Sequence, residues 1–324
     1  MNRKKIAAFT FGIGLMAVLA GCGKQKSNGV TDSDTFSVNV RYTIDGKATD
    51  ELPDGMHYDF VSVSGGESLN AEWDEASWAL VTDEAESGTY TCTVDFTATT
   101  AIFKMNNVGY ASLQAAFDAA SSNPTVIECL QDYEGHGITS ADSQITLRLN
   151  GHTIDGIGSD TIVNRGTLSI VGDGTITNTV DGKYTKTLIN YGTLELTDLT
   201  ISNATSNATI WNSQNAYSVM DITNCSITHE IAESNVIINS GTMNLHSGIL
   251  FSDASEGYSL LKINHEDAIV NYYDGTFACT GDGFTVTLLF GSFRNYSDHD
   301  ITQGNQLGDY AKAHSAEDDP LRQQ

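Results

Sequence analysis

The chain has 324 residues, 40% hydrophobic and 18% charged, a length that suits one large or two modest domains. With 30 Gly and only 3 Pro, this composition excludes collagen-like, coiled-coil and wholly disordered chains, each of which needs a stronger bias. Acidic residues exceed basic ones by 41 − 16 = 25. Nucleic acid is therefore not an expected partner, because its binding depends on Lys and Arg neutralising phosphates, and acidic polysaccharides meet the same repulsion.

Residues 1–22 have the features of an export signal. Three basic residues precede an apolar run over residues 6–18, which is shorter than the ~20 residues that a membrane-spanning helix needs. The run ends in Leu19-Ala20-Gly21-Cys22, which resembles the lipobox of bacterial lipoproteins. The resemblance implies that Cys22 carries fatty acyl chains such as palmitate and becomes the mature N-terminus. We expect an exported protein, lipid-anchored to the membrane on its extracellular face, with residues 23–34 as a flexible tether.

Residues 35–107 are expected to form a small all-β domain. Apolar and polar residues alternate, as in Phe36–Val40 and Tyr90–Val94, and Asp and Gly residues separate these runs. Period-two alternation with such turns is typical of half-buried antiparallel strands. The pattern predicts a β-sandwich-like domain.

A helix is expected next, over residues 112–121. Apolar residues recur at helical spacing between Leu113 and Ala120, Ser112 is placed to cap the N-terminus, and Asn123-Pro124 ends the segment. An apolar strand over residues 126–130 follows.

The rest of the chain repeats itself. The segments Ile162–Leu168, Leu188–Leu194 and Ile237–Met243 share two apolar residues, Asn, one variable residue, Gly, Thr and an apolar residue. Two weaker copies contain Asn212 and Asn264. Successive Asn residues of the five copies are 26, 22, 27 and 25 residues apart. A unit of this size cannot bury its apolar side alone, but it can when stacked on copies of itself.

This repeat predicts an all-β fold. We expect a right-handed parallel β-helix of about seven coils over residues 108–301, with the capping helix at its start and a polar tail over residues 302–324. The expected inward side chains are Leu147, Leu149, Val163, Leu168, Ile189, Leu194, Trp211 and Ile238. The expected amide ladder, stacked at one bend, consists of Asn164, Asn190, Asn212, Asn239 and Asn264.

Two further segments carry a family resemblance. Tyr110–Ala120, followed by a strand and then by Ile145–Ile154, resembles the opening of many bacterial cell-surface proteins with a pectin-lyase-like β-helix. The resemblance covers about residues 108 to 300 and implies the fold, export and a helix that covers the open end of the solenoid. It leaves function open, because this superfamily includes lyases, glycosidases, adhesins and structural modules.

Catalytic motifs of that superfamily match poorly. Gly135-His136-Gly137 resembles one polygalacturonase motif, but it precedes the repeats, and the acid motif Asn-Thr-Asp and the basic motif Arg-x-Lys are absent from the mature chain. Pectate-lyase-like enzymes need calcium-binding carboxylates beside a basic residue, whereas the basic residues of the solenoid are spread over different faces. We expect no catalysis; the alternative is a polysaccharide lyase or glycoside hydrolase of the same fold.

Two sets of residues are candidate sites. Carboxylates at a recurring turn could hold Ca²⁺, although Asp before Gly more often accepts backbone N–H bonds; these residues are Asp173, Asp198 and Asp274. Outward aromatic residues could form a recognition surface, although they could equally be scattered over a solvated flank; these residues are Tyr184, Tyr191, Tyr217, Tyr272 and Tyr273. No other cofactor is expected.

Besides Cys22 the chain has four cysteines, Cys92, Cys129, Cys225 and Cys279. No two of them form a C-x-x-C pair, so a zinc site is not expected. Their even number in an exported protein permits disulfides, and buried free thiols are an equal alternative. The favoured function is a surface-displayed binding or adhesion module for glycans or proteins of a host or microbial surface. A purely architectural spacer is the third possibility.

Overall fold

The computed structural model describes most of the chain and divides it into two compact units, residues 1–100 and 101–324. None of the described segments forms a helix with the length and apolarity that crossing a bilayer needs. The predicted lipidation site Cys22 and the tether 23–34 lie outside the described residues. Those described are 6–9, 36–49, 52–53, 56–65, 69–74, 79–82, 88–106, 108–120, 122–180, 183–214, 218–298 and 306–307.

The first unit contains two small sheets. The larger has the order β3-β2-β7-β4, and β2 pairs with β7 in parallel, so the expectation of purely antiparallel strands is wrong. The smaller sheet includes Ile6–Phe9, which lies in the predicted leader and pairs with β6. The bounds are β1 Ile6–Phe9, β2 Phe36–Ile44, β3 Lys47–Thr49, β4 Met56–Gly65, β5 Ala71–Asp74, β6 Ala79–Thr82 and β7 Gly88–Thr100.

The core of the first unit is aromatic. Side chains from both sheets meet around Phe96, whose ring is 5.3 Å from Trp73 and 5.9 Å from Tyr58, centroid to centroid. Val38, Leu80 and other apolar residues complete this cluster. The unit is thus two sheets that share one core around a single ring.

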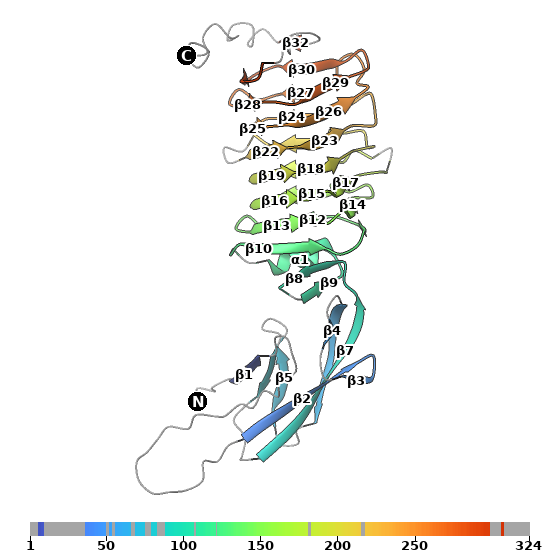
Figure 1. Cartoon of the computed structure of the whole chain (residues 1–324), viewed down its shortest axis with the longest axis vertical. Coiled ribbons are helices and arrows are strands. Elements are labelled where there is room, and N and C mark those ends of the chain that lie inside the picture. Colours follow the sequence, from blue (N-terminus) through green and yellow to red (C-terminus); the bar gives the residue numbers. More distant parts are fainter. Residues whose placement is uncertain are drawn as a thin grey trace, which may run out of the picture. The chain divides into compact units, whose positions relative to one another are not determined.

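The second unit is a parallel β-helix, as predicted (Figure 1). Each coil contributes three consecutive strands. Seven such sets, from β10–β12 to β28–β30, lie one above the other, so the chain makes six turns from the first set to the last. Each strand pairs in parallel with its equivalents in the neighbouring coils, so the chain builds three long sheets.

The three sheets are called here sheets C, D and E. Sheet C contains β9 Val108–Tyr110, β8 Phe103–Met105, β10 Thr125–Cys129, β13 Gln144–Arg148, β16 Thr167–Val171, β19 Thr193–Thr197, β22 Val219–Thr223, β25 Thr242–Leu245, β28 Ile269–Tyr272 and β31 Ser292–Asn295. Sheet D contains β11 Tyr133–Glu134, β14 Thr153–Asp155, β17 Thr175–Thr177, β20 Thr200–Ile201, β23 Cys225–Thr228, β26 Gly248–Ser252 and β29 Thr276–Cys279. Sheet E contains β12 Gly137–Ile138, β15 Ile162–Asn164, β18 Leu188–Asn190, β21 Ile210–Asn212, β24 Ile237–Asn239, β27 Ser259–Ile263, β30 Phe284–Leu288 and β32 Gln306–Leu307.

A helix and a hairpin cover the first coil. Helix α1, Leu113–Ala119, begins at Ser112, whose hydroxyl accepts a hydrogen bond from the backbone N–H of Ala115 at 3.1 Å. Its apolar side packs into the solenoid core. The hairpin β8–β9 extends sheet C because β8 pairs with β10. The boundary between the units therefore falls at 100/101, earlier than the 107/108 that the sequence indicated.

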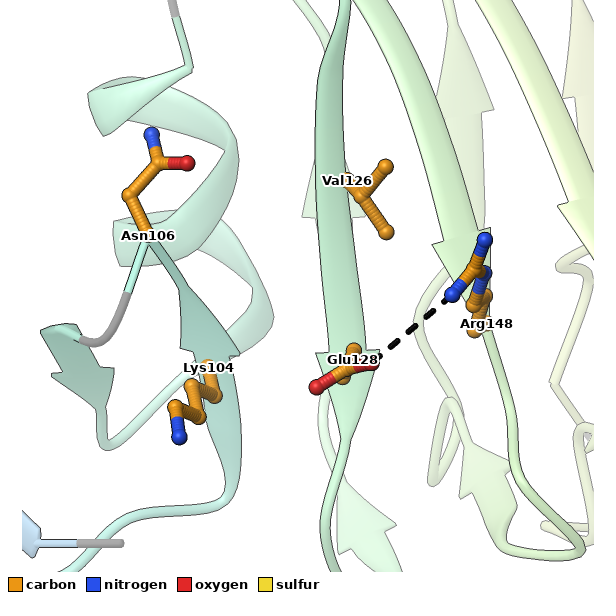
Figure 2. Close-up of a pocket in the computed structure, with 5 residues that line it drawn as sticks. All are labelled: Lys104, Asn106, Val126, Glu128 and Arg148. Atoms are coloured by element: carbon orange, nitrogen blue, oxygen red, sulfur yellow. Dashed lines mark ion pairs between the residues drawn. The ribbon is translucent and has the colours of Figure 1, made fainter. Parts of the chain in front are cut away.

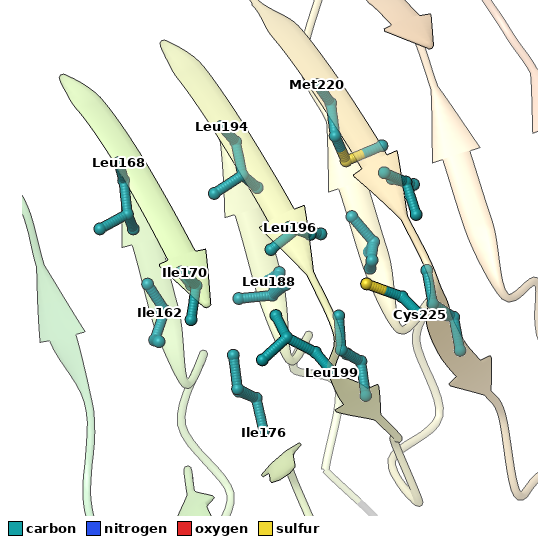
Figure 3. Packing of buried hydrophobic residues seen from close by; sticks show 14 of the residues in the cluster. Ile162, Leu168, Ile170, Ile176, Leu188, Leu194, Leu196, Leu199, Met220 and Cys225 are labelled. Carbon is teal, nitrogen blue, oxygen red and sulfur yellow. The ribbon is translucent and has the colours of Figure 1, made fainter. Parts of the chain in front are cut away.

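The solenoid core consists of stacked aliphatic side chains (Figure 3). Leu168 and Leu194 of neighbouring coils pair in register and are buried, as predicted. On sheet E the expected inward positions are displaced by one residue. Ile162 belongs to the core cluster and Asn164 to the amide ladder, and because side chains alternate along a strand, Val163 lies on the other side. Val163 is nevertheless buried, 7% exposed, and so is its equivalent Ile189, 5% exposed. The same correction replaces Ile189 by Leu188, Ile238 by Ile237 and Trp211 by Ile210.

The amide ladder forms along sheet E with four of its five predicted members. Asn164 donates to Asn190 at 2.8 Å, Asn190 to Asn212 at 2.8 Å and Asn212 to Asn239 at 2.7 Å. Asn264 does not belong to it: Ile263 pairs with Asn239, and Asn264 is exposed. The ladder ends there because Ile263 takes the position opposite Asn239, and Asn264 follows it one residue later, beyond the end of β27.

Candidate binding surface

One row of side chains runs along the outside of sheet C for its whole length. It alternates with buried positions such as Leu147, Ile170 and Leu245, so it faces outward. Cross-strand pairing places these side chains in register. The members are paired directly as far as Thr223, and each later member comes one residue after the last paired residue of its strand. This outer row consists of Lys104, Glu128, Arg148, Val171, Thr197, Thr223, His246, Tyr273 and Tyr296.

The last three members of the outer row form a ring stack. The His246 and Tyr273 rings have centroids 5.0 Å apart and planes 6° apart, and those of Tyr273 and Tyr296 are 5.1 Å and 14° apart. This spacing matches the ~4.8 Å rise between paired strands. Because the rings cover one another's faces, the stack presents mainly its edges and hydroxyl groups to solvent. Tyr273 is 42% exposed and Tyr296 40% exposed.

A polar row lies beside the ring stack, two residues earlier on each strand. Asp221 Oδ1 accepts a hydrogen bond from Asn244 Nδ2 at 2.9 Å, and Asn244 Oδ1 accepts one from Asn271 Nδ2 at 2.7 Å. The Nε2 atom of His246 lies 3.3 Å from the same Asp221 oxygen. These contacts fix the imidazole at the base of the ring stack and bring hydrogen-bonding groups to its side.

The opposite end of the outer row contains a shallow hollow of about 280 Å³ (Figure 2). Lys104 and Asn106 line it from β8 and the turn that follows, and Val126, Glu128 and Arg148 line it from β10 and β13. Arg148 Nη1 is 3.9 Å from Glu128 Oε1. We call this site, defined by these five residues, the basic hollow, because two cations flank one carboxylate.

The five predicted tyrosines do not form one surface. Tyr273 belongs to the ring stack, and Tyr184 is 78% exposed on a separate loop. Tyr272 is in the core, 1% exposed, and its hydroxyl donates to the backbone oxygen of Gly275 at 2.7 Å. It points inward because it pairs with the buried Leu245. Tyr217 lies outside the described residues.

Tyr191, the remaining predicted tyrosine, contacts Trp211 on the outside of sheet E. Their ring centroids are 5.8 Å apart in an edge-to-face arrangement, and Lys186 Nζ lies 5.2 Å from the centroid of the indole ring. Burial lowers the pKa of Lys186, and nearby Asp160 opposes this. Trp211 is therefore a half-buried outer residue, covered by a cation and a ring, rather than the core residue that we predicted.

Two of the three predicted calcium carboxylates accept hydrogen bonds within the protein. Asp198 accepts a hydrogen bond from Asn224 Nδ2 at 2.6 Å, and Asp274 accepts one from the backbone N–H of Gly275 at 2.7 Å. Asp173 lies on the corresponding turn of another coil. Within the described part of the chain, no three His, Cys, Asp or Glu side chains gather in a way that would hold a metal ion. Asp274 thus makes the backbone contact expected of an Asp that precedes Gly at a turn.

The four cysteines are free thiols, three of them buried. Burial raises the pKa of Cys129 and of Cys225 to about 11, so both are poor nucleophiles. Gly137, from the glycosidase-like motif, has a packing role: a Cβ atom there would lie 2.7 Å from Leu113 Cγ and 2.8 Å from Phe117 Cε2. The glycine lets the capping helix approach the first coil.

Sequence reasoning missed two members of the ring stack, His246 and Tyr296. The signal was present: the steps from His246 to Tyr273 and from Tyr273 to Tyr296 are 27 and 23 residues, both within the range of coil lengths. Aligning aromatic residues to the repeat would have found them. Asp221 gave no such signal, because acidic residues are common throughout the chain.

Comparison with protein-family models gives no match, and comparisons with curated proteins and with solved structures give no significant match. The fold and the geometry of the outer row are therefore the basis for assigning a function.

Proposed function

We propose that the chain is a non-catalytic, lipid-anchored binding module of the extracellular surface, and that it binds glycans on the C-terminal part of sheet C. The lipobox motif supports the anchor, and the resemblance of the chain's opening to pectin-lyase-like surface proteins supports an adhesin-like role. The ring stack beside the polar row is the observation that carries the binding site.

The site suits a sugar because it combines two kinds of contact. Asp221, Asn244 and the tyrosine hydroxyls supply donors and acceptors for hydroxyl groups. The face of Tyr296 that points away from Tyr273 meets no further ring within the described part of the chain, so it can take the apolar face of a sugar ring. A rigid sheet holds all of these groups, which lowers the entropy lost on binding.

The strongly negative net charge favours a ligand that is mainly neutral. Each carboxylate on this face also repels an anionic polymer and is screened only in part at physiological salt. Neutral oligosaccharides are therefore the first class to test.

The test is a glycan and matrix-protein array probed with residues 23–324, the mature chain without its lipidated Cys22, and with three variants of it. Tyr273→Ala should weaken binding about tenfold, since truncating a central aromatic anchor commonly costs more than 1 kcal/mol. Tyr273→Phe keeps the stack and loses one hydroxyl, so it should have an intermediate effect. Tyr184→Ala is the matched control, because it removes an exposed tyrosine on another loop.

Four results would contradict the proposal. If no glycan bound, the proposed function would be wrong. If the chain bound only a matrix protein, the ligand would be a protein and not a glycan. If Tyr184→Ala lost as much affinity as Tyr273→Ala, the ring stack would not be the binding site. Release of reducing ends or unsaturated sugars, abolished by Asp221→Asn, would instead show a carbohydrate-active enzyme. Thermal unfolding of each variant controls for loss of the fold.

A further inference from the structure

We infer that the basic hollow is a subsite for a single carboxylate at one end of the glycan, while the body of the glycan lies along the outer row. This inference rests on the proposed function, because it assigns the ligand class and the binding direction for the same face. The evidence is the charge of the hollow, its donors and the character of the row that joins it to the ring stack.

The hollow is cationic within an acidic protein. Two of the 16 basic residues, Lys104 and Arg148, flank Glu128 on adjacent strands, so the five lining residues carry a net charge of +1, whereas the whole chain carries −25. Arg148 and Glu128 are 52% and 42% exposed at the side chain and 3.9 Å apart. Such an exposed pair is weak, so the guanidinium can turn toward a ligand carboxylate and bind it through two parallel hydrogen bonds.

The other lining groups fit the end of a sugar. Asn106 adds an amide that can donate to or accept from a hydroxyl group. Val126, which is 40% exposed, adds an apolar wall against which the ring carbons can pack. In Figure 2, Asn106 lies on the side of Lys104, and Val126 lies on the side of Glu128 and Arg148.

The row between the hollow and the ring stack is uncharged. It contains Val171, Thr197 and Thr223, all half-buried, so no long side chain blocks a ligand that lies along it. Four coil steps separate Arg148 from His246, about 19 Å at the strand spacing of ~4.8 Å. A linear oligosaccharide can therefore reach both ends.

The neighbouring polar row decides how many carboxylates the ligand can carry. Glu195 and Asp221 face the same side of sheet C as the uncharged stretch. They would repel a second or third anionic unit along a polyuronic chain. The favoured ligand is thus a neutral oligosaccharide with one terminal uronic acid.

The first experiment titrates sodium glucuronate into the mature chain and follows binding by calorimetry. Arg148→Gln should weaken binding about tenfold, as expected for the loss of a charge-assisted hydrogen bond, and Lys104→Gln should also weaken it. Arg165→Gln, an exposed arginine elsewhere in the solenoid, is the matched control and should bind normally. Absence of saturable binding, or equal loss in the control, would overturn the subsite.

The second experiment separates the subsite from the proposed function. It compares an oligosaccharide with and without a terminal uronic acid. Tyr273→Ala should weaken both, whereas Arg148→Gln should weaken only the acid-terminated form. If Arg148→Gln affects both equally or neither, the subsite is wrong and the glycan-binding face stands. If neither oligosaccharide binds, the proposed function fails, and the glucuronate titration still decides whether the hollow binds a carboxylate.

Discussion

The two units of this protein build their cores in different ways. In the first unit four rings, Tyr42, Tyr58, Phe60 and Trp73, surround Phe96 at centroid distances between 5.3 and 6.4 Å. In the solenoid every coil contributes similar aliphatic side chains, and none is central. A small domain buries too little area to spread its stability widely, whereas a repeat adds the same increment with every coil. One substitution should therefore affect the two units differently.

Phe96→Ala should have the largest effect. It removes the ring that all four aromatic neighbours contact, so we expect a loss of about 3–5 kcal/mol from the unfolding free energy of the first unit. Calorimetry should show one transition moved to lower temperature and the solenoid transition unchanged. A matched change, Leu194→Ala, removes one core side chain of a single coil and should shift only the solenoid transition. If Phe96→Ala shifted both transitions together, the two cores would not be independent.

Acid should weaken the solenoid through His229. This imidazole is 2% exposed, its Nδ1 atom lies 3.1 Å from Thr209 Oγ1, and its Nε2 atom has no hydrogen-bond partner. Burial lowers the pKa of His229 from 6.5 to about 4, and the charge of Asp253 opposes this only in part. Because the folded state resists protonation, the unfolded state binds the proton first as pH falls.

The stability contributed by neutral His229 is complete above pH 6.5 and is lost progressively down to about pH 4. The loss amounts to about 3 kcal/mol. Denaturant unfolding of His229→Gln between these pH values should show a flatter profile than the parent chain. An unchanged slope in His229→Gln would exclude this residue as the cause.

Breaking the amide ladder should have a smaller effect. Asn212→Ala removes the buried amide that donates a hydrogen bond to Asn239 and accepts one from Asn190. An unsatisfied buried polar group costs about 1–3 kcal/mol, so we expect a loss in that range by denaturant unfolding. Asn264→Ala, outside the ladder and exposed, should change stability by less than about 0.5 kcal/mol. Similar losses in both variants would mean that the ladder does not contribute.

The repeat predicted most of the solenoid but not every position in it. The period of the Asn residues predicted the parallel coils and four of the five ladder positions, and the helical spacing of apolar residues between Leu113 and Ala120 predicted the capping helix. Asn264 was misplaced because β27 pairs with β24 one residue out of step with the motif, so that Ile263 lies opposite Asn239, and no local pattern signals this register. Val163 was misplaced because both it and Ile162 are apolar, and hydrophobicity alone does not tell which of two adjacent apolar residues points inward.

The binding surface was predictable only in part. Tyr273 was a candidate from its type, yet Tyr272 beside it was an equal candidate, and alternation along β28 alone separates them. The basic hollow had no sequence signal at all. Its residues come from positions 104, 106, 126, 128 and 148, and the pairing of β8 with β10 brings them together.

The sequence by itself determined the period, the elements and the capped parallel solenoid, because a regular repeat of apolar side chains admits few other ways to bury them. Tertiary structure alone decided which face each side chain takes, where the amide ladder ends and which distant residues share the outside of sheet C. These depend on strand register, and in a strand a shift of one residue exchanges the inner and outer faces.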